Sequence, residues 1–206
     1  MLNLMRRQIY LQENILKKTI NLFVILLILC LGLSSKSIAN EKWILDKNIS
    51  SISFEVPVLF ATNVIGKFEN IDGFVELDLK DKKNNKAILS VDIGSLKVNY
   101  KKYMDLILGP VFFDSTKYPF GVLDTKKFAY NNEEKLNLDI ELSIKGVTKI
   151  IDTELTIINL TSDLVQIKGL LEISRKDFNI GTGNWKNATI LKDNIIIKSN
   201  LFLMRN

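Results

Sequence analysis

Hydrophobic and polar residues alternate without exception over the ten residues from Leu136 to Lys145. Gly146 interrupts the alternation. Beyond Gly146 the alternation resumes, and Ile151, Thr153, Leu155 and Ile157 occupy its hydrophobic positions. A period of two residues is typical of a half-buried strand and does not fit a helix, so these segments predict a long antiparallel hairpin with one apolar face. A strand of ten residues extends over about 34 Å, and its apolar face needs a deep partner such as the interior of a barrel or of a large sandwich.

Shorter alternating segments predict further strands along the rest of the chain. They are separated by turns rich in Asn, Asp and Gly, and they cover residues 51–56, 75–79, 88–93, 121–128, 164–174 and 189–204. Residues 99–108 differ, because hydrophobic side chains recur there at spacings of three and four; this predicts a short amphipathic helix ended by Gly109-Pro110. About eight strands and one helix indicate an all-β barrel or sandwich in a single domain.

The first 39 residues have the three-part pattern of a secretory signal peptide. A basic segment precedes a hydrophobic run over residues 20–33, and Ser37-Ile38-Ala39 places small residues where a signal peptidase reads the chain. The hydrophobic core of this run is about 13 residues long, whereas a helix that spans a bilayer needs about 20. We therefore predict cleavage after Ala39, and not an uncleaved membrane anchor, which leaves residues 40–206 as the mature domain.

The charge of this mature domain gives no indication of nucleic-acid binding. The whole chain has a net charge of +5, but residues 1–39 contain five basic residues and one acidic residue. The mature domain keeps 23 basic and 22 acidic residues, with the two signs interspersed. Such a balance offers no basic stripe to a phosphate backbone, so we expect no nucleic-acid partner.

Residues 40–206 contain neither cysteine nor histidine. The domain therefore has no disulfide, no thiolate nucleophile, and no imidazole base or metal ligand. This excludes most hydrolytic triads and most zinc sites. Asp139 and Glu141 fall on the polar face of the long strand, where we expect surface charge and not acid–base catalysis. We expect a protein that is not an enzyme, with no catalytic residue, no metal and no cofactor.

Several short motifs follow one another in a fixed order along the chain. They are Trp43-x-Leu45-Asp46, Ser51-x-Ser53-Phe54, Gly66-x-Phe68, Ile71-x-Gly73, Phe112-Phe113-Asp114-x-x-Lys117-Tyr118-Pro119, Leu142-x-Ile144-x-Gly146-Val147-Thr148-Lys149 and Ser174-Arg175-x-Asp177-Phe178-x-Ile180-Gly181. Together they resemble the YceI-like family of exported, lipocalin-like, polyisoprenoid-binding proteins. The chain departs from the family at Leu106-Ile107-Leu108-Gly109, where members commonly have a His-Leu-Arg-Ser-like run, and at Asn179, where many have Gly.

The resemblance implies that residues 40–206 form an eight-stranded antiparallel, lipocalin-like barrel with one short amphipathic helix. It also implies a periplasmic protein without known catalytic activity, whose apolar pore holds a polyprenyl or similar lipid. We therefore expect a periplasmic carrier of a long-chain isoprenoid or fatty-chain lipid. The alternative is a non-enzymatic, envelope stress-related interaction module, with a filled barrel and exposed apolar edge residues such as those of 195–197. Both functions are compatible with a homodimer.

Phenylalanine is frequent in the segments that predict the barrel, and some of its rings are candidates for the pore wall. A barrel of about eight strands either packs solid or holds one ligand, so ordinary core packing is the alternative for each residue. The candidate ligand-binding residues are Phe54, Val56, Phe60, Phe68, Phe74, Phe112, Phe113, Phe120, Leu138, Ile140, Leu142, Leu155 and Phe178.

Three further residues, Tyr118, Arg175 and Asp177, are candidates for contact with a ligand head group. On a strand, Arg175 and Asp177 would face the same way, so that they pair with each other or Arg175 meets an anionic group. A structural ion pair in the loop is the alternative. Tyr118 either contacts a pyrophosphate or only sets the entry into the next strand, since a residue before proline is extended.

Overall fold

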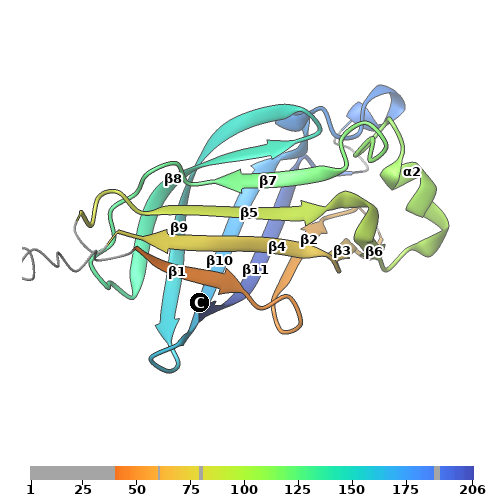
Figure 1. Ribbon diagram of the computed structural model, residues 1–206. Coiled ribbons are helices and arrows are strands. Elements are labelled where there is room, and N and C mark those ends of the chain that lie inside the picture. The colour runs from red at the N-terminus through yellow and green to blue at the C-terminus, as the bar shows by residue number, and fades with distance from the viewer. Residues whose placement is uncertain (1–39, 60, 79–80, 188–190) are drawn as a thin grey trace, which may run out of the picture. The chain divides into compact units, whose positions relative to one another are not determined.

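The computed structural model describes residues 40–59, 61–78, 81–187 and 191–206 (Figure 1). The predicted signal peptide, with its cleavage after Ala39, lies outside the described residues, and so does Phe60. Within the described ranges, no helix is long and apolar enough to cross a bilayer.

The described residues form eleven strands and five short helices. The strands are β1 (Glu41–Leu45), β2 (Ser51–Val56), β3 (Val64–Phe68), β4 (Ile71–Leu77), β5 (Lys86–Asp92), β6 (Leu96–Val98), β7 (Phe120–Asp124), β8 (Lys135–Ile144), β9 (Val147–Asn159), β10 (Leu164–Ser174) and β11 (Asn194–Arg205). The α-helix is α2 (Met104–Leu108), and the 3-10 helices are η1 (Ile93–Ser95), η2 (Lys101–Tyr103), η3 (Arg175–Phe178) and η4 (Gly183–Lys186). The predicted amphipathic helix is thus confirmed, as η2 followed by α2.

The strands form one antiparallel sheet that closes into an eight-stranded barrel. Three of the eight barrel strands are bent. Each consists of two short strands that follow one another in sequence: β1 and β2, β3 and β4, and β5 and β6. β4 pairs with β1 and β5, and β3 pairs with β2 and β6. After β7 to β10 in order, β11 closes the barrel by pairing with both β1 and β2. The predicted all-β fold is therefore confirmed.

Side chains and loop backbone satisfy the polar groups that leave the ladder at the bends. Between β1 and β2, the Asp46 amide donates to the Phe202 carbonyl at 2.8 Å, and the Phe202 amide donates to Ser50 Oγ at 2.8 Å. Between β3 and β4, the Asn70 amide donates to Ser95 Oγ at 2.9 Å. Because buried amides need partners, these contacts let three strands bend without opening the barrel.

The long hairpin predicted from the alternating pattern is formed by β8 and β9. The two strands pair from Lys135↔Thr156 to Ile144↔Val147. The register sets Ile140 opposite Ile151 in the interior, where Ile140 is 1% exposed, while acidic residues of the two strands meet on the outer face. Each strand therefore has one apolar and one polar face, as the sequence predicts.

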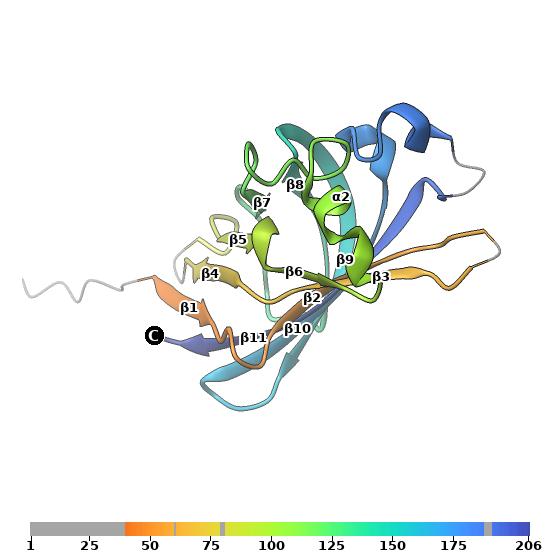
Figure 2. The same ribbon diagram turned by 90° about the vertical axis from the view of Figure 1, so that its right-hand side faces the viewer.

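β9 and β10 pair over only part of their length. The pairing runs from Asn159↔Val165 to Leu155↔Gly169, and beyond it these two fully described strands share no further ladder. The rest of β10 pairs with β11 alone, and η3 contacts β9. Figure 2 shows the segment after β10 beside the tip of the β8–β9 hairpin. Beyond Gly169 no ladder joins the two strands, and η3 contacts β9 after the end of β10.

Lys145, at the tip of this hairpin, joins the loops that close one end of the barrel. Its Nζ donates to the carbonyl oxygens of Pro110 at 2.8 Å, Val111 at 3.3 Å and Asn179 at 2.8 Å. Positive φ angles at Lys145 and Gly146, of 52° and 73°, make the tight two-residue turn that holds the ammonium group there. Burial lowers the pKa of Lys145, so this contact is made by a partly desolvated charge.

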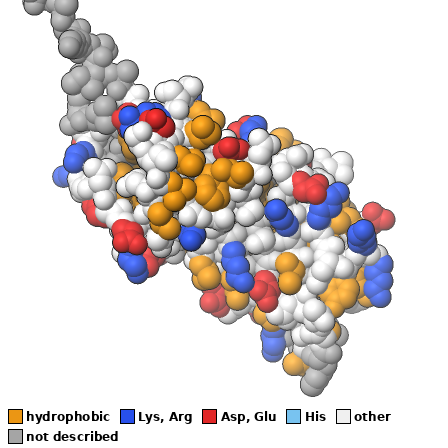
Figure 3. All heavy atoms as spheres, turned by 90° about the horizontal axis from the view of Figure 1, so that it is seen from below, with side chains coloured by type: hydrophobic (Ala, Val, Ile, Leu, Met, Phe, Trp, Pro, Cys, Tyr) orange, Lys and Arg blue, Asp and Glu red, His pale blue; other side chains and the backbone are white. Residues whose placement is uncertain are grey.

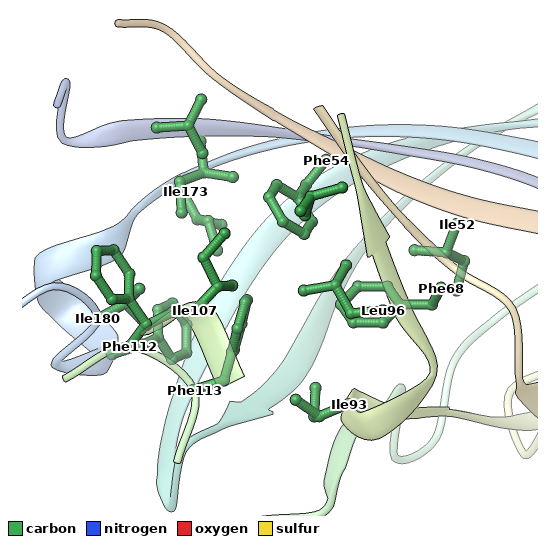
Figure 4. Close-up of a cluster of buried hydrophobic side chains, with 14 of the residues drawn as sticks. Ile52, Phe54, Phe68, Ile93, Leu96, Ile107, Phe112, Phe113, Ile173 and Ile180 are labelled. Carbon is green, nitrogen blue, oxygen red and sulfur yellow. The ribbon is translucent and has the colours of Figure 1, made fainter. Parts of the chain in front are cut away.

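Three aromatic rings pack below these loops and block the closed end. The ring centroids of Phe54, Phe68 and Phe113 lie 5.9, 6.0 and 6.4 Å apart, a separation typical of favourable aromatic pairs. Figure 4 shows them among isoleucine and leucine side chains from the strands and from α2. Gly66 lies opposite Phe54 in β3, and a Cβ atom there would overlap the Phe54 ring. The cluster therefore depends on the missing side chain.

The outer face of the barrel carries interspersed charges and one row of apolar side chains. Pairing places the row directly across five neighbouring strands, in the order Leu164, Met204, Ile44, Phe74 and Ile88. In Figure 3, which shows the molecule from below, hydrophobic side chains gather in the middle of the face and charged ones lie around them. The exterior is thus not uniformly polar.

We expect Gly66→Ala to destabilise the domain by about 1–3 kcal/mol, because the added methyl group forces the Phe54 ring out of its position. Urea unfolding measures this change. Gly94→Ala is the matched control, since its Cβ would meet only Asp92 Oδ1, at 3.2 Å. Equal stability of the two variants would contradict the role assigned to Gly66.

Candidate ligand-binding site

The barrel interior contains an apolar cavity of about 170 Å³, here called the lumen cavity. Phe54, Phe68 and Phe113 border it at the closed end. The interior is hollow because several positions that face it carry small side chains. These are Gly73, Ala87, Gly121, Gly169 and Ser199. A barrel of about eight strands is just wide enough for side chains to fill, so each small residue leaves space.

A second cavity, of about 370 Å³, lies at the opposite end and is here called the mouth cavity. The two cavities adjoin, because six residues border both of them: Val75, Ala87, Thr125, Leu155, Ile167 and Leu203. Polar residues from the turns and chain ends border it. They are Glu41, Asn132, Asn159, Thr161, Ser162 and Arg205. Together the two cavities fall in the range of about 300–1,000 Å³ that is usual for small-molecule sites, with an apolar interior and a polar entrance.

Arg205 lies at the mouth between two carboxylates. Its guanidinium is 3.5 Å from Glu41 and 3.8 Å from Asp163, and it stacks 5.1 Å from the Trp43 ring centroid.

Burial raises the pKa of Tyr130, and the charge of a nearby glutamate adds to this. Tyr130 therefore stays a neutral hydrogen-bonding group at the mouth.

Most of the predicted pore-lining residues border these cavities. Phe54, Phe68, Phe74, Phe113, Ile140, Leu142 and Leu155 border the lumen cavity, and Leu138 and Leu155 border the mouth cavity. Val56, Phe112 and Phe178 are buried but lie outside both linings. In the closed end, the Phe112 ring packs 5.6 Å from the ring of Trp185.

Phe74 and Phe120 point away from the interior. Phe74 borders the lumen next to Gly73, but its ring lies 4.8 Å from Lys42 Nζ, in the apolar row of the outer face. Phe120 is 58% exposed, because the next residues of β7, Gly121 and Leu123, take the inward positions. The strand period therefore excludes both rings from the pore wall.

Arg175 is fully buried, and its guanidinium group is hydrogen-bonded to backbone carbonyl oxygens. Its nitrogen atoms donate to the carbonyl oxygens of Lys192, Ile180, Gly181 and Leu191 at 3.0, 3.0, 3.2 and 3.1 Å. Asp193 lies 3.2 Å from Nη2. Burial lowers the pKa of Arg175, although the Asp193 charge opposes this. Arg175 therefore holds the loop between β10 and β11 in place, through carbonyl oxygens and an ion pair with Asp193.

Arg175 does not pair with Asp177. The chain leaves the strand at Arg175 and enters η3, so the two side chains do not share a strand face, and Asp177 is exposed. Tyr118 lies against Gly146 at the hairpin tip. None of these three head-group candidates borders either cavity. Across the described ranges, no group of three or more acidic, cysteine or histidine residues is placed to hold a metal ion.

Comparison with known proteins identifies the family. The model of the YceI-like domain matches residues 43–202, nearly all of the described barrel. The chain belongs to the YceI-like family.

Relatives of this YceI-like domain are distant in sequence. A UPF0312 protein of Photorhabdus laumondii is 30% identical over 132 residues, which are 62% of this chain and 67% of that protein. A UPF0312 protein of Vibrio campbellii is 28% identical over 114 residues, 55% of this chain. The chain spans 60% of the length of that Vibrio protein.

Solved structures share the fold more completely. BcnA of Burkholderia cenocepacia superposes with a TM-score of 0.69 at 27% identity, covering 77% of this chain and 98% of BcnA. A polyisoprenoid-binding domain of Saccharophagus degradans gives a TM-score of 0.64 at 15% identity, over 80% of this chain and 98% of that domain. The YceI protein of Campylobacter jejuni gives 0.62 at 21%, over 73% and 89%.

The two departures from the YceI-like pattern have structural explanations. Asn179 has a φ of 54°, a left-handed conformation that Gly adopts freely and Asn tolerates. In the run Leu106-Ile107-Leu108-Gly109, Ile107 is buried in the closed end, and its two neighbours pack against the same core. The first change preserves the turn, and the second extends the apolar closure.

Sequence reasoning missed the mouth residues and Thr153. Trp43, Tyr130 and Arg205 come from distant segments, so only the closed barrel brings them together. Trp43 belongs to a family motif, but that motif does not point to the mouth, and the other two residues carry no motif. The alternation predicts Thr153 on the apolar face of its strand, and its only distinguishing sign in the sequence is a polar residue at a hydrophobic position.

We expect Arg175→Met to destabilise the domain by about 3–5 kcal/mol, because it leaves the carbonyl oxygens of Ile180, Gly181 and Leu191 without their donor in the closed end. Asp193 keeps its ion pair with Lys176, at 2.6 Å. Asp177→Asn, two residues away and exposed, should stay within about 0.5 kcal/mol of the wild type. Urea unfolding compares the variants. A stable Arg175→Met protein that only loses lipid affinity would instead make Arg175 a head-group ligand.

Proposed function

We propose that this YceI-like protein is a non-catalytic carrier that holds a long-chain isoprenoid or similar amphiphilic lipid in its barrel. The observation that carries the proposal is the uncharged lumen cavity, which adjoins a cavity with a polar border at one end and is blocked by aromatic rings at the other. Two comparisons support it: the chain matches the YceI-like domain, and a structural neighbour of the same fold is a polyisoprenoid-binding domain.

The energetics of apolar burial are sufficient for such binding. Each methylene group removed from water contributes about 0.8 kcal/mol, so ten to twelve buried carbons give about 8–10 kcal/mol. That corresponds to roughly micromolar affinity before ordering costs are subtracted. An apolar cavity of about 150 Å³ already takes up benzene, and the lumen and mouth cavities together are larger.

The periplasm is the proposed location of this carrier. The argument is the pattern of residues 1–39, a basic segment, a short hydrophobic run and Ser37-Ile38-Ala39. The lack of cysteine in residues 40–206 makes folding independent of the redox state of that compartment.

The alternative, an interaction module with a filled barrel, has less support. Ile195 is buried, and β11 pairs with β10 on one side and with β1 and β2 on the other, so residues 195–197 form no exposed edge. The cavities also argue against an interior filled by side chains. The outer apolar row is the observation that supports this alternative.

Native mass spectrometry of protein purified without detergent tests the proposal directly. The expected result is a bound species whose mass matches a long-chain lipid and which organic extraction removes. An empty protein that also fails to take up a fluorescent fatty chain would refute the carrier function.

A blocking substitution tests the site. Leu155 borders both cavities, so Leu155→Trp should fill their junction and lower the affinity for a fluorescent fatty-chain probe at least about tenfold. Leu170→Trp is the control, because Leu170 lies on the neighbouring strand, points outward and is 61% exposed. Fluorescence titration measures both, and equal affinities would place the lipid outside the barrel.

A further inference from the structure

A lipid held in the barrel leaves its head group at the mouth. The closed end is blocked by the packed rings of Phe54, Phe68 and Phe113. None of the described residues that line the lumen cavity is charged, and a charge buried there without a partner would be strongly unfavourable. A ligand therefore enters with its apolar tail first, and its head group stays among the residues that border the mouth cavity.

Two of the described residues that border the mouth cavity are charged, Glu41 and Arg205, and they pair with each other. The Glu41 carboxylate is held from two directions. Trp43 Nε1 donates to its Oε2 at 3.4 Å, and the Arg205 guanidinium lies 3.5 Å from its Oε1. Trp43 is itself buried in the barrel. The carboxylate of Glu41 therefore has a defined position at the entrance.

Arg205 is held on several sides as well. Its backbone amide donates to the Asp163 carbonyl at 3.0 Å, and the Asp163 carboxylate lies 3.8 Å from its Nε. Glu41 takes another side of the guanidinium, and the Trp43 ring lies against its face. Two negative charges thus oppose one positive charge, and among the described residues no lysine borders either cavity. The mouth has no excess positive charge to offer to an anionic head group.

The other polar groups at the border of the mouth cavity are uncharged. They are the side chains of Tyr130, Asn132, Asn159, Thr161 and Ser162. Amide and hydroxyl groups both donate and accept hydrogen bonds, so this border fits a hydroxyl, carbonyl or amide head group. A phosphate could approach Arg205 only next to the two carboxylates, and like charges a few ångströms apart repel each other even in water.

From these contacts, and resting on the carrier function proposed above, we infer that the mouth selects lipids with an uncharged, hydrogen-bonding head group over lipids with an anionic one. Glu41 is the residue that determines this specificity, because it opposes the charge of Arg205 from a fixed position. Asp163 adds to the effect from a more exposed position, since its side chain is 67% exposed and that of Glu41 is 26% exposed.

Three probes that share one chain test this inference: dodecan-1-ol, dodecyl phosphate and dodecyltrimethylammonium. Displacement of a fluorescent fatty-chain probe measures their affinities, and wild-type protein should bind the alcohol more tightly than the phosphate. Glu41→Gln removes the charge but keeps the shape and an acceptor for the Trp43 indole. It should raise the affinity for the phosphate about fivefold, lower that for the ammonium by about the same factor, and leave that for the alcohol within about twofold. Each probe is compared between variant and wild type, so differences in solubility cancel.

Glu76→Gln is the matched control, because it makes the same change in net charge on the outer face of the neighbouring strand. Glu76 lies opposite Lys42 in the ladder and 3.9 Å from its Nζ. This variant should change no affinity by more than about twofold. Asp163→Asn is a second test at the mouth, and it should shift the three affinities in the same directions as Glu41→Gln by a smaller factor. Added salt should reduce both sets of shifts, since it screens exposed charges.

The outcomes separate the two proposals. If the probes bind but Glu41→Gln leaves the affinity for the phosphate unchanged, the role of Glu41 is refuted and the carrier function stands. Equal shifts in Glu76→Gln would reduce the effect to net charge and also overturn the assignment. If wild-type protein binds none of the three probes, the carrier function fails, and the inference fails with it.

Discussion

The fold depends on the need of a two-faced sheet to bury its apolar face. Every inward position of the long β8–β9 hairpin must find a partner away from water, and the sheet meets this demand by closing on itself through β11. In a barrel of about eight strands, the size of the inward side chains then decides whether the interior is solid or hollow. The glycines and other small residues of the wall make it hollow here.

Two cations, Lys145 and the buried Arg175, connect the loops of the closed end, and neither borders a cavity. Lys145 binds carbonyl oxygens from two loops, and Arg175 binds four others together with Asp193. Both are desolvated, and burial lowers the pKa of each. Lys145 joins the tip of the β8–β9 hairpin to the loops around Pro110 and Asn179, and Arg175 joins parts of the loop between β10 and β11. Neither residue borders a cavity, so each is a structural contact and not a head-group site.

The three parts of the barrel contribute to the proposed binding in different ways. The closed end blocks the barrel with packed side chains, the lumen supplies apolar area, and the mouth supplies the polar contact with water.

The sequence by itself determined the strand content, the hairpin of β8 and β9, the short helix and the family, because two-residue alternation and local motifs are properties of neighbouring residues. It also placed Ile140, Leu142 and Leu155 on the inner face, since a strand of known phase has no other choice. Only the tertiary structure decided that Phe74 and Phe120 face outward, that Arg175 pairs with Asp193, and that Trp43, Tyr130 and Arg205 meet at the mouth. These outcomes depend on register, bends and chain closure, which join residues far apart in sequence and leave no local pattern.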